Sequence, residues 1–110
     1  MGKFVKGAVV VLPFPFSDLT GSKRRPAFVL ANLDGDDVIL CQITSRAKYD
    51  PYAVAVKSAD FESGSLSVDS YIRPNKIFTA DKKLILSVAG QLSEKKASEV
   101  VDTVISILSK

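Results

Sequence analysis

The sequence predicts a small, mainly β domain in which a strongly bent antiparallel sheet or barrel carries one C-terminal helix. Short β-branched and apolar runs recur along most of the chain, and glycine, proline and aspartate separate them. Apolar residues take up the period of a helix only after Ser93. The chain has 110 residues, the length of one domain with a modest core, so we expect residues 1–110 to form a single domain.

The first half of the chain predicts three strands and a hairpin. The strands are expected at residues 8–12, 26–33 and 38–43. The first is a β-branched run that Pro13 and Pro15 end. The stretch 34–36 (Asp-Gly-Asp) follows the second, and Asp-Gly is among the strongest short signals for an antiparallel hairpin. Because the end of the third strand then lies beside the start of the second, we expect Thr44 to lie close to Arg25.

The second half predicts further short strands and one helix. Strands are expected at 52–56, 66–72 and 86–89, with 77–78 extending the sheet, a loop at 60–65 and a short helical turn at 79–83. We expect Thr79 to cap that turn and Gly90 to end the last strand. After Ser93, a suitable N-cap residue, apolar side chains recur at helical spacing. They are Ala97, Val100, Val101, Val104 and Leu108.

Composition narrows the classes of function. The net charge is +3 and the pI about 9.1, which is compatible with a nucleic-acid partner. The chain has no histidine and one cysteine, Cys41, which we expect to be a small buried hydrophobe. This argues against a zinc site and removes the usual general base. Aspartates 34, 36 and 37 lie across the hairpin tip, where turn chemistry explains them better than a metal cluster does. We therefore expect no metal and no cofactor.

The sequence shows no signal peptide and no long apolar span. A helix that crosses a membrane needs about 20 consecutive apolar residues. We therefore expect a cytoplasmic protein that does not contact a membrane.

Three stretches place cations in predicted loops. They are Lys23-Arg24-Arg25, Arg46 with Lys48, and Arg73 with Lys76. Pro26 forces Arg25 into extended backbone at the mouth of the second strand, where a loop gives access. Arginine suits phosphate because its planar fork donates two parallel hydrogen bonds and stays charged. These cations form an anion-binding site or are solvated loop charges, and the pattern leaves both interpretations open.

Thr44 and Ser45 also have two interpretations. Hydroxyls just after a strand can close a side-chain turn and do nothing more. Next to Arg25, a hydroxyl can instead orient a phosphate. Among the aromatic residues, Tyr49 is the one expected to stack on a base. The others are expected to be mostly core or loop anchors: Phe14, Phe16, Tyr52 and Tyr71.

Seven short stretches, in order along nearly the whole chain, carry a resemblance to a known family. They are Gly7-Ala8-Val9-Val10, Phe14-Pro15-Phe16-Ser17-Asp18, Lys23-Arg24-Arg25-Pro26-Ala27, Ile43-Thr44-Ser45, Asp60-Phe61 with Gly64, Ser70-Tyr71-Ile72-Arg73-Pro74, and Gly90-Gln91-Leu92-Ser93. In these stretches the sequence resembles the MazF/PemK family of toxin ribonucleases from bacterial toxin–antitoxin pairs. The arginine-proline and Ile-Thr-Ser stretches together are fairly specific, although each alone is weak.

The resemblance implies an SH3-like barrel with a terminal helix, usually as a homodimer. It implies metal-independent cleavage of single-stranded RNA at a preferred sequence, leaving 2′,3′-cyclic phosphate and 5′-hydroxyl ends. It also implies neutralisation by a cognate antitoxin, whose acidic disordered tail folds onto the dimer. The family's catalytic pair falls on Arg25 and Thr44. The residues expected to contact RNA are Lys23, Arg24, Ser45, Arg46, Lys48, Arg73 and Asn75.

Two positions depart from the family's pattern. Asn75 stands where some members carry an acid, and Ala8 stands where many members carry one. With no histidine present, the sequence assigns no general base. Two other interpretations stay open. One is a gyrase poison like CcdB, which shares the fold and cuts nothing, and the other is a non-catalytic RNA-binding module.

Overall fold

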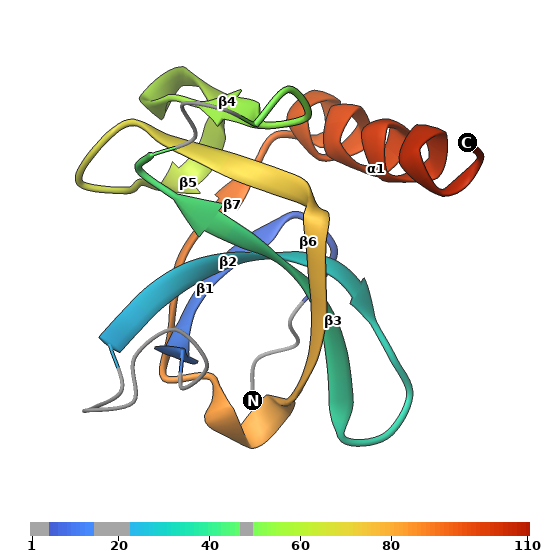
Figure 1. Cartoon of the computed structure of the whole chain (residues 1–110). Coiled ribbons are helices and arrows are strands. Elements are labelled where there is room, and N and C mark those ends of the chain that lie inside the picture. The colour runs from blue at the N-terminus through green and yellow to red at the C-terminus, as the bar shows by residue number, and fades with distance from the viewer. Residues whose placement is uncertain (1–4, 15–22, 47–49) are drawn as a thin grey trace.

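The computed structural model describes residues 5–14, 23–46 and 50–110, and of Phe14 and Lys23 the backbone alone. Seven strands form one antiparallel sheet in the order β4-β6-β3-β2-β1-β7-β5 (Figure 1). The strands are β1 (Ala8–Phe14), β2 (Lys23–Asn32), β3 (Asp37–Thr44), β4 (Val54–Val56), β5 (Phe61–Gly64), β6 (Ser70–Asp81) and β7 (Ser87–Leu92). The helices in the described ranges are α1 (Glu94–Leu108) and the short 3₁₀ helices η1 (Ser58–Asp60) and η2 (Lys82–Leu84).

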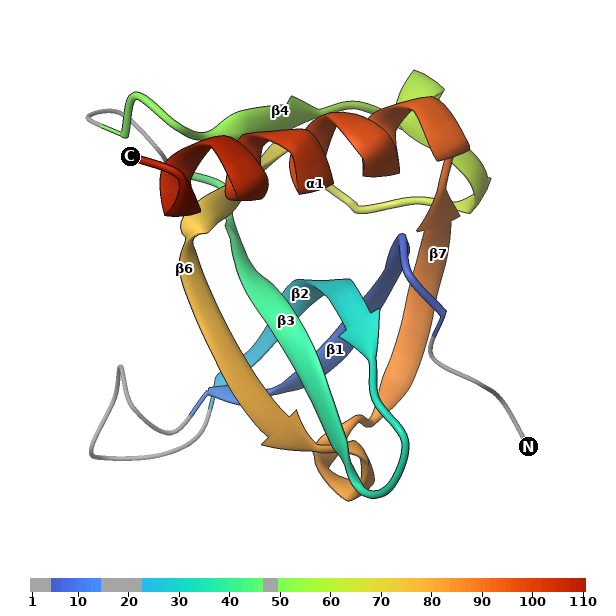
Figure 2. The same cartoon turned by 90° about the vertical axis from the view of Figure 1, so that its right-hand side faces the viewer.

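The sheet is curled, and α1 packs across it. Figure 2 shows the helix running above the curled strands, with β6 and β7 descending on either side. The helix begins where the sequence predicts it, because the Ser93 hydroxyl accepts a hydrogen bond from the Lys96 N–H at 3.2 Å. The predicted mainly β fold with a C-terminal helix is confirmed.

Two apolar clusters lie on opposite faces of the central strands. One is beneath α1 and consists of Val9, Phe28, Cys41, Ile43, Val54, Val56, Ile72, Leu92, Ala97, Val100 and Val104. The other consists of Ala8, Val10, Leu12, Ala27, Val29, Val38 and Leu40. Alternation along each strand produces this division, because successive side chains point to opposite faces. Cys41 is fully buried, as predicted, and burial raises the pKa of its thiol to about 12.

The predicted bounds of the first two strands are too narrow. β1 runs on to Phe14 and β2 begins at Lys23, because these ends pair with each other. The register places Leu12 opposite Arg25 and Phe14 opposite Lys23. Arg25 therefore lies inside a strand and not at its mouth. The register with β3 begins only at Ala27, so Arg25 is fixed by β1 near the open end of the β2–β3 hairpin.

The segment 60–65, predicted as a loop, contains strand β5, which pairs with β7. Gly90, predicted to end the last strand, lies inside β7. A Cβ atom at Gly90 would lie 2.6 Å from the carbonyl oxygen of Ser63, so glycine permits the close approach of β5. Gly90 therefore does not end the strand but allows β5 and β7 to pack closely.

Strand β6 begins later than predicted, because residues 66–69 precede it. It also ends later than predicted, because Thr79 lies within it, opposite Ile39. The turn expected at 79–83 follows as η2, and its capping side chain is Asp81, which accepts from the Lys83 N–H at 2.8 Å. The strand predicted at 52–56 is reduced to β4. Arg73 consequently lies in a strand and not in a loop, beside a bulge between the pairs Gln42–Arg73 and Cys41–Ile77.

Candidate functional site

The hairpin of β2 and β3 brings Arg25 and Thr44 together, as the sequence predicts. Ala27 lies opposite Gln42 in the antiparallel register, so Arg25 and Thr44 follow at the same end of the hairpin. Both residues line one hollow of about 310 Å³, which we call the β2–β3 hollow. The start of β2, the end of β3 and the segment 66–68 form its walls. Residues that are 19 positions apart in the sequence thus share one site.

Arg25 carries a buried donor that bonds to none of the described residues. Its side chain is half-buried, and its Nε atom is buried with no hydrogen-bond partner among the described residues. A buried donor left unsatisfied costs about 1–3 kcal/mol, so such groups in a native fold call for an explanation. A phosphate oxygen has the charge that arginine favours, which makes Arg25 a candidate contact for an anion.

The Thr44 hydroxyl closes a side-chain turn. Its Oγ1 atom accepts a hydrogen bond from the Arg46 N–H and donates one to the Arg46 carbonyl oxygen, both at 3.1 Å. The predicted side-chain turn is therefore present, and Thr44 is also one of the residues that line the β2–β3 hollow. Ser45 and Arg46 are exposed beside it. Thr44 has the position to touch a ligand and already fixes the course of the loop that follows β3.

The register of β3 with β6 brings two residues to the site that the sequence analysis does not include, Gln42 and Tyr71. Gln42 lies opposite Arg73, and Thr44 lies opposite Tyr71, in the pairing of β3 with β6. Paired residues of antiparallel strands share a face, and alternate residues of one strand do so too. One face of the sheet therefore presents Arg25, Gln42, Thr44, Tyr71 and Arg73, and we call it the polar face. Tyr71 is 36% exposed and is not a core anchor. Alternation with the buried Ile72 is the sequence signal that could have placed it outward.

Arg73 has a partner that the sequence does not reveal. Its Nε atom donates to Oδ2 of Asp50 at 2.6 Å, and the Asp50 side chain is only 4% exposed. Oδ1 of Asp50 accepts from the Tyr52 N–H at 2.9 Å. Burial by itself would raise the pKa of Asp50, but the hydrogen bonds from Arg73 and Tyr52 and the charge of Arg73 outweigh it and hold that pKa below its ordinary value.

Of the other predicted site residues, some are exposed in the structure and some lie outside the described residues. Arg24 is exposed at the β2–β3 hollow, close to Arg25 in the chain. Asn75 and Lys76 are exposed in the bulged part of β6. Three sets of predicted positions lie outside the described residues. They are Lys48 and Tyr49, the loop 17–22 with Phe16, and the side chains of Lys23 and Phe14.

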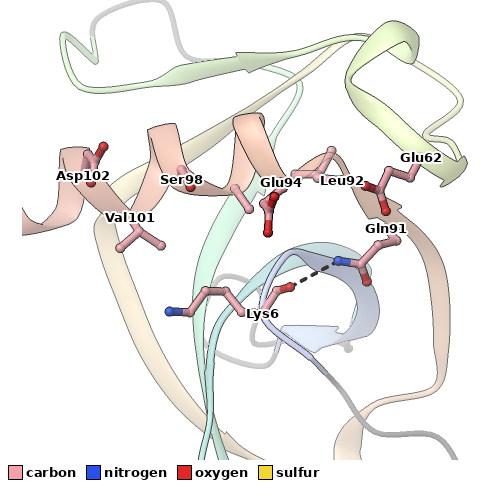
Figure 3. Close-up of a pocket in the computed structure, with 9 residues that line it drawn as sticks. Lys6, Glu62, Gln91, Leu92, Glu94, Ser98, Val101 and Asp102 are labelled. Atoms are coloured by element: carbon pink, nitrogen blue, oxygen red, sulfur yellow. Dashed lines mark hydrogen bonds between the residues drawn. The ribbon is translucent and has the colours of Figure 1, made fainter.

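A second hollow, of about 520 Å³, lies at the opposite side of the fold, and we call it the α1–β7 cleft. Figure 3 shows Glu94 and Asp102 on the helix, Glu62 on β5, and Lys6 ahead of β1 around it. The Gln91 side chain donates to the Lys6 carbonyl oxygen at 3.1 Å. Three carboxylates and one ammonium group give this cleft an acidic lining, which disfavours phosphate.

No group of three or more cysteine, aspartate or glutamate side chains in residues 5–14, 23–46 and 50–110 is arranged to hold a metal ion. Within the same ranges, no helix has the length and apolarity needed to cross a membrane.

Comparisons with known proteins agree with this architecture. Residues 6–108 match the model of a family described as PemK-like, MazF-like toxins of type II toxin–antitoxin systems. A crystal structure of MazF from Deinococcus radiodurans superposes with a TM-score of 0.73 at 24% identity, covering 96% of each chain. An endoribonuclease in complex with its cognate antitoxin from a mycobacterial species gives 0.74 at 16% identity, covering 96% of this chain and 94% of that one. The toxin MazF-mt6 of Mycobacterium tuberculosis gives 0.73 at 13%, covering 93% and 96%. A search of curated protein sequences finds no match.

Proposed function

The chain belongs to the PemK-like, MazF-like toxins of type II toxin–antitoxin systems, and on that premise we propose that it is an endoribonuclease that cuts single-stranded RNA at a preferred sequence without a metal ion. The observation that carries the proposal is that Arg25, whose buried Nε has no hydrogen-bond partner among the described residues, lines the same hollow as Thr44. A donor that is already desolvated and charged is suited to an oxyanion that develops during reaction. Arg25 and Thr44 are the proposed catalytic residues.

The proposed reaction uses the substrate's own nucleophile. The ribose 2′-hydroxyl attacks the adjacent phosphorus, a P–O bond forms, and the bond to the 5′ oxygen of the next nucleotide breaks. The products are a 2′,3′-cyclic phosphate and a 5′-hydroxyl, and the 2′ proton is balanced by the proton that the leaving oxygen gains. Arg25 stabilises the charge on the phosphorane, and Thr44 aligns the phosphate or the 2′-hydroxyl. With no histidine in the chain, alignment and charge stabilisation carry most of the rate.

We propose that the RNA runs over the polar face and the β2–β3 hollow. Arg24, Arg46 and Arg73 attract the phosphate backbone, which supplies most of the affinity and makes it salt-dependent. Ser45 and Asn75 add neutral hydrogen bonds, and Lys23 and Lys48 add charge in the adjoining segments. The exposed ring of Tyr71 beside Thr44 offers a surface on which a base can stack, so it joins the proposed RNA contacts.

The proposed protein partner is a cognate antitoxin. The mycobacterial neighbour is an endoribonuclease in complex with such a partner. An acidic segment laid over Arg25, Arg46 and Arg73 would neutralise the cations that bind RNA, so we expect antitoxin and RNA to exclude each other. The proposed location is the cytoplasm.

We also propose a homodimer. The helix α1 leaves Ile105 55% exposed, outside the stripe that packs on the sheet. Leu108, which the sequence predicts within that stripe, is 71% exposed at the end of the helix, so this part of the prediction is wrong. Ile107 is half-buried. Sedimentation at micromolar concentration should show a dimer that Ile105→Glu with Leu108→Glu converts to a monomer.

One experiment tests the proposed activity. The protein is incubated with a short RNA that contains its cut site and with the same RNA carrying a single 2′-deoxyribose at the nucleotide 5′ to that bond. We expect cleavage of the first in EDTA and none of the second, with similar binding of both. Cleavage of the deoxy substrate at the same bond would make water the nucleophile and overturn the mechanism. Binding without any cleavage would indicate an RNA-binding module, and neither binding nor cleavage would favour a protein target such as gyrase.

A further inference from the structure

We propose that Asp50 is a positioning residue of the RNA site, which holds Arg73 by its Nε atom so that the terminal guanidinium nitrogens face a phosphate on the polar face. The inference rests on the proposed RNA-cleaving function. Asp50 is almost fully covered, at 4% exposure, and therefore does not touch RNA itself. Its effect on RNA passes through Arg73, which is 26% exposed.

Both oxygens of the Asp50 carboxylate are occupied in the fold. Oδ2 accepts from Nε of Arg73 at 2.6 Å, and Oδ1 accepts from the Tyr52 N–H at 2.9 Å. The Asp50 carbonyl oxygen accepts from the Ala53 N–H at 3.3 Å, so the turn after Asp50 is also closed. A carboxylate held at both oxygens by short bonds is a rigid anchor, and it restricts the arginine that it binds.

The anchor leaves most of the guanidinium unused. Arginine has five N–H donors, and Asp50 takes the one on Nε. The four donors on the two terminal nitrogens make no hydrogen bond to any residue in the described ranges. Two of them form the planar edge that binds phosphate through parallel hydrogen bonds. A side chain fixed at one edge therefore presents the other edge already oriented.

The strand register gives the oriented arginine a place beside the proposed catalytic pair. Arg73 lies opposite Gln42, and two residues earlier in β6 Tyr71 lies opposite Thr44. The residues of both pairs share the polar face with Arg25. The Asp50–Arg73 contact also connects the chain that leaves β3 after Thr44 to β6, across 23 positions of sequence. One ion pair thus ties the loop that carries Ser45 and Arg46 to the strand that carries Arg73.

Two effects of Asp50 on RNA binding oppose each other. Its negative charge weakens the long-range attraction of Arg73 for phosphate, whereas its hydrogen bond removes the rotamer freedom that binding would otherwise have to restrict. The repulsion between Asp50 and the phosphate acts across the Arg73 guanidinium, whose positive charge lies nearer to both, and salt screens the part of it that passes through solvent. Ordering a long side chain on binding costs enough to change affinity about 3- to 10-fold. Orientation is therefore expected to outweigh charge at physiological salt.

The test uses Asp50→Asn, which keeps the acceptor for the Tyr52 N–H and removes the charge that holds Arg73. Binding of a non-cleavable 2′-deoxy oligonucleotide and single-turnover cleavage of the matching RNA are both measured at physiological salt. We expect an approximately 3- to 10-fold weaker affinity, measured where the variant is still folded, together with a lower melting temperature because the ion pair also stabilises the fold. The control is Asp60→Asn, because Asp60 pairs with Lys96 at 3.8 Å away from the polar face and should leave affinity unchanged.

A double-mutant cycle separates positioning from a merely structural role. If Asp50 acts through Arg73, the double variant Asp50→Asn with Arg73→Ala binds no more weakly than Arg73→Ala alone. Additive losses, or a lower melting temperature with normal RNA affinity, would overturn the proposal. Should Asp50→Asn fail to fold, Arg73→Lys decides instead. Lysine at position 73 can still pair with Asp50, but it lacks the second guanidinium edge that faces the phosphate. We therefore expect Arg73→Lys to bind RNA as weakly as Arg73→Ala does. RNA binding by Arg73→Lys that is as tight as that of wild type overturns the proposal.

These outcomes are distinguishable from failure of the proposed function itself. A wild-type protein that neither cuts nor binds RNA contradicts the endoribonuclease proposal and the role of Asp50 with it. A wild-type protein that cuts RNA, with Asp50→Asn binding as tightly as wild type, contradicts only the role of Asp50.

Discussion

The β2–β3 hollow and the α1–β7 cleft differ in size and in charge. Size favours the cleft as the site for RNA, whereas charge favours the hollow. The cleft is the larger, at about 520 Å³ against 310 Å³ for the hollow. Its lining carries Glu62, Glu94 and Asp102 with Lys6, whereas the hollow carries Arg24 and Arg25 and no carboxylate among its described lining. A polyanion is drawn by charge before it can gain from shape. The smaller hollow is therefore the better site for a phosphate.

The two places also differ in how their polar groups are satisfied. At the cleft, the Gln91 amide donates to the Lys6 carbonyl oxygen and ties β7 to the chain ahead of β1. At the hollow, Arg25 is a lining residue whose buried Nε has no partner among the described residues. A polar group that is bonded within the fold serves stability, whereas a buried donor without a partner is available for a ligand. We therefore expect the cleft to serve stability and the hollow to bind the ligand.

Arg25→Ala is the change expected to have the largest effect. Losing one charged donor from the site should lower the single-turnover rate by ~10²–10³-fold, by analogy with the loss of an oxyanion-stabilising donor. The fold should survive, because the substitution removes a donor that the described fold leaves unbonded. Single-turnover cleavage and a thermal melt measure the two effects. A near-normal rate with a clean melting transition would contradict the catalytic role, and Arg24→Ala, at an exposed neighbour, is the matched control with a smaller loss.

Thr44 comes next, and here two variants separate its roles. Thr44→Val keeps the side-chain shape but loses the hydroxyl and both of its hydrogen bonds to Arg46. Because the loop after β3 and the substrate are then misplaced, we expect the cleavage rate to fall by ~10²-fold. Thr44→Ser keeps the hydroxyl and should retain part of the activity, although its χ1 angle is less restricted. Rates of both are measured at saturating enzyme. Equal rates for valine and serine would make Thr44 structural.

Neutralising the α1–β7 cleft should have the smallest effect. Glu94→Gln together with Asp102→Asn removes two of the three carboxylates of its lining without changing side-chain volume. If the cleft does not meet RNA, the cleavage rate and RNA affinity stay within about twofold of wild type at physiological salt, where exposed charges are screened beyond ~8 Å. Titration of a labelled RNA with both proteins makes the comparison. A tenfold change would mean that RNA reaches the cleft and would reverse the assignment of the two regions.

The sequence by itself determined the features that depend on near neighbours in the chain. Asp34-Gly35-Asp36 predicts the hairpin, and the hairpin brings Thr44 and Arg25 to one hollow. Ser93 and the apolar period after it predict where the helix begins. These predictions succeed because turn and capping preferences are local and the period of side chains follows from backbone geometry.

Only the tertiary structure decided which distant segments pair. Strand β5 exists because β7 lies against it, and Gly64 and Gly90 allow that contact, although both look like chain breakers in the sequence. Asp50 looks like part of an Asp-Pro turn, yet the pairing of β4 with β6 brings this part of the chain beside β6, where Asp50 meets Arg73. Long-range pairing depends on the balance of packing over the whole sheet, and no short stretch of sequence contains that balance.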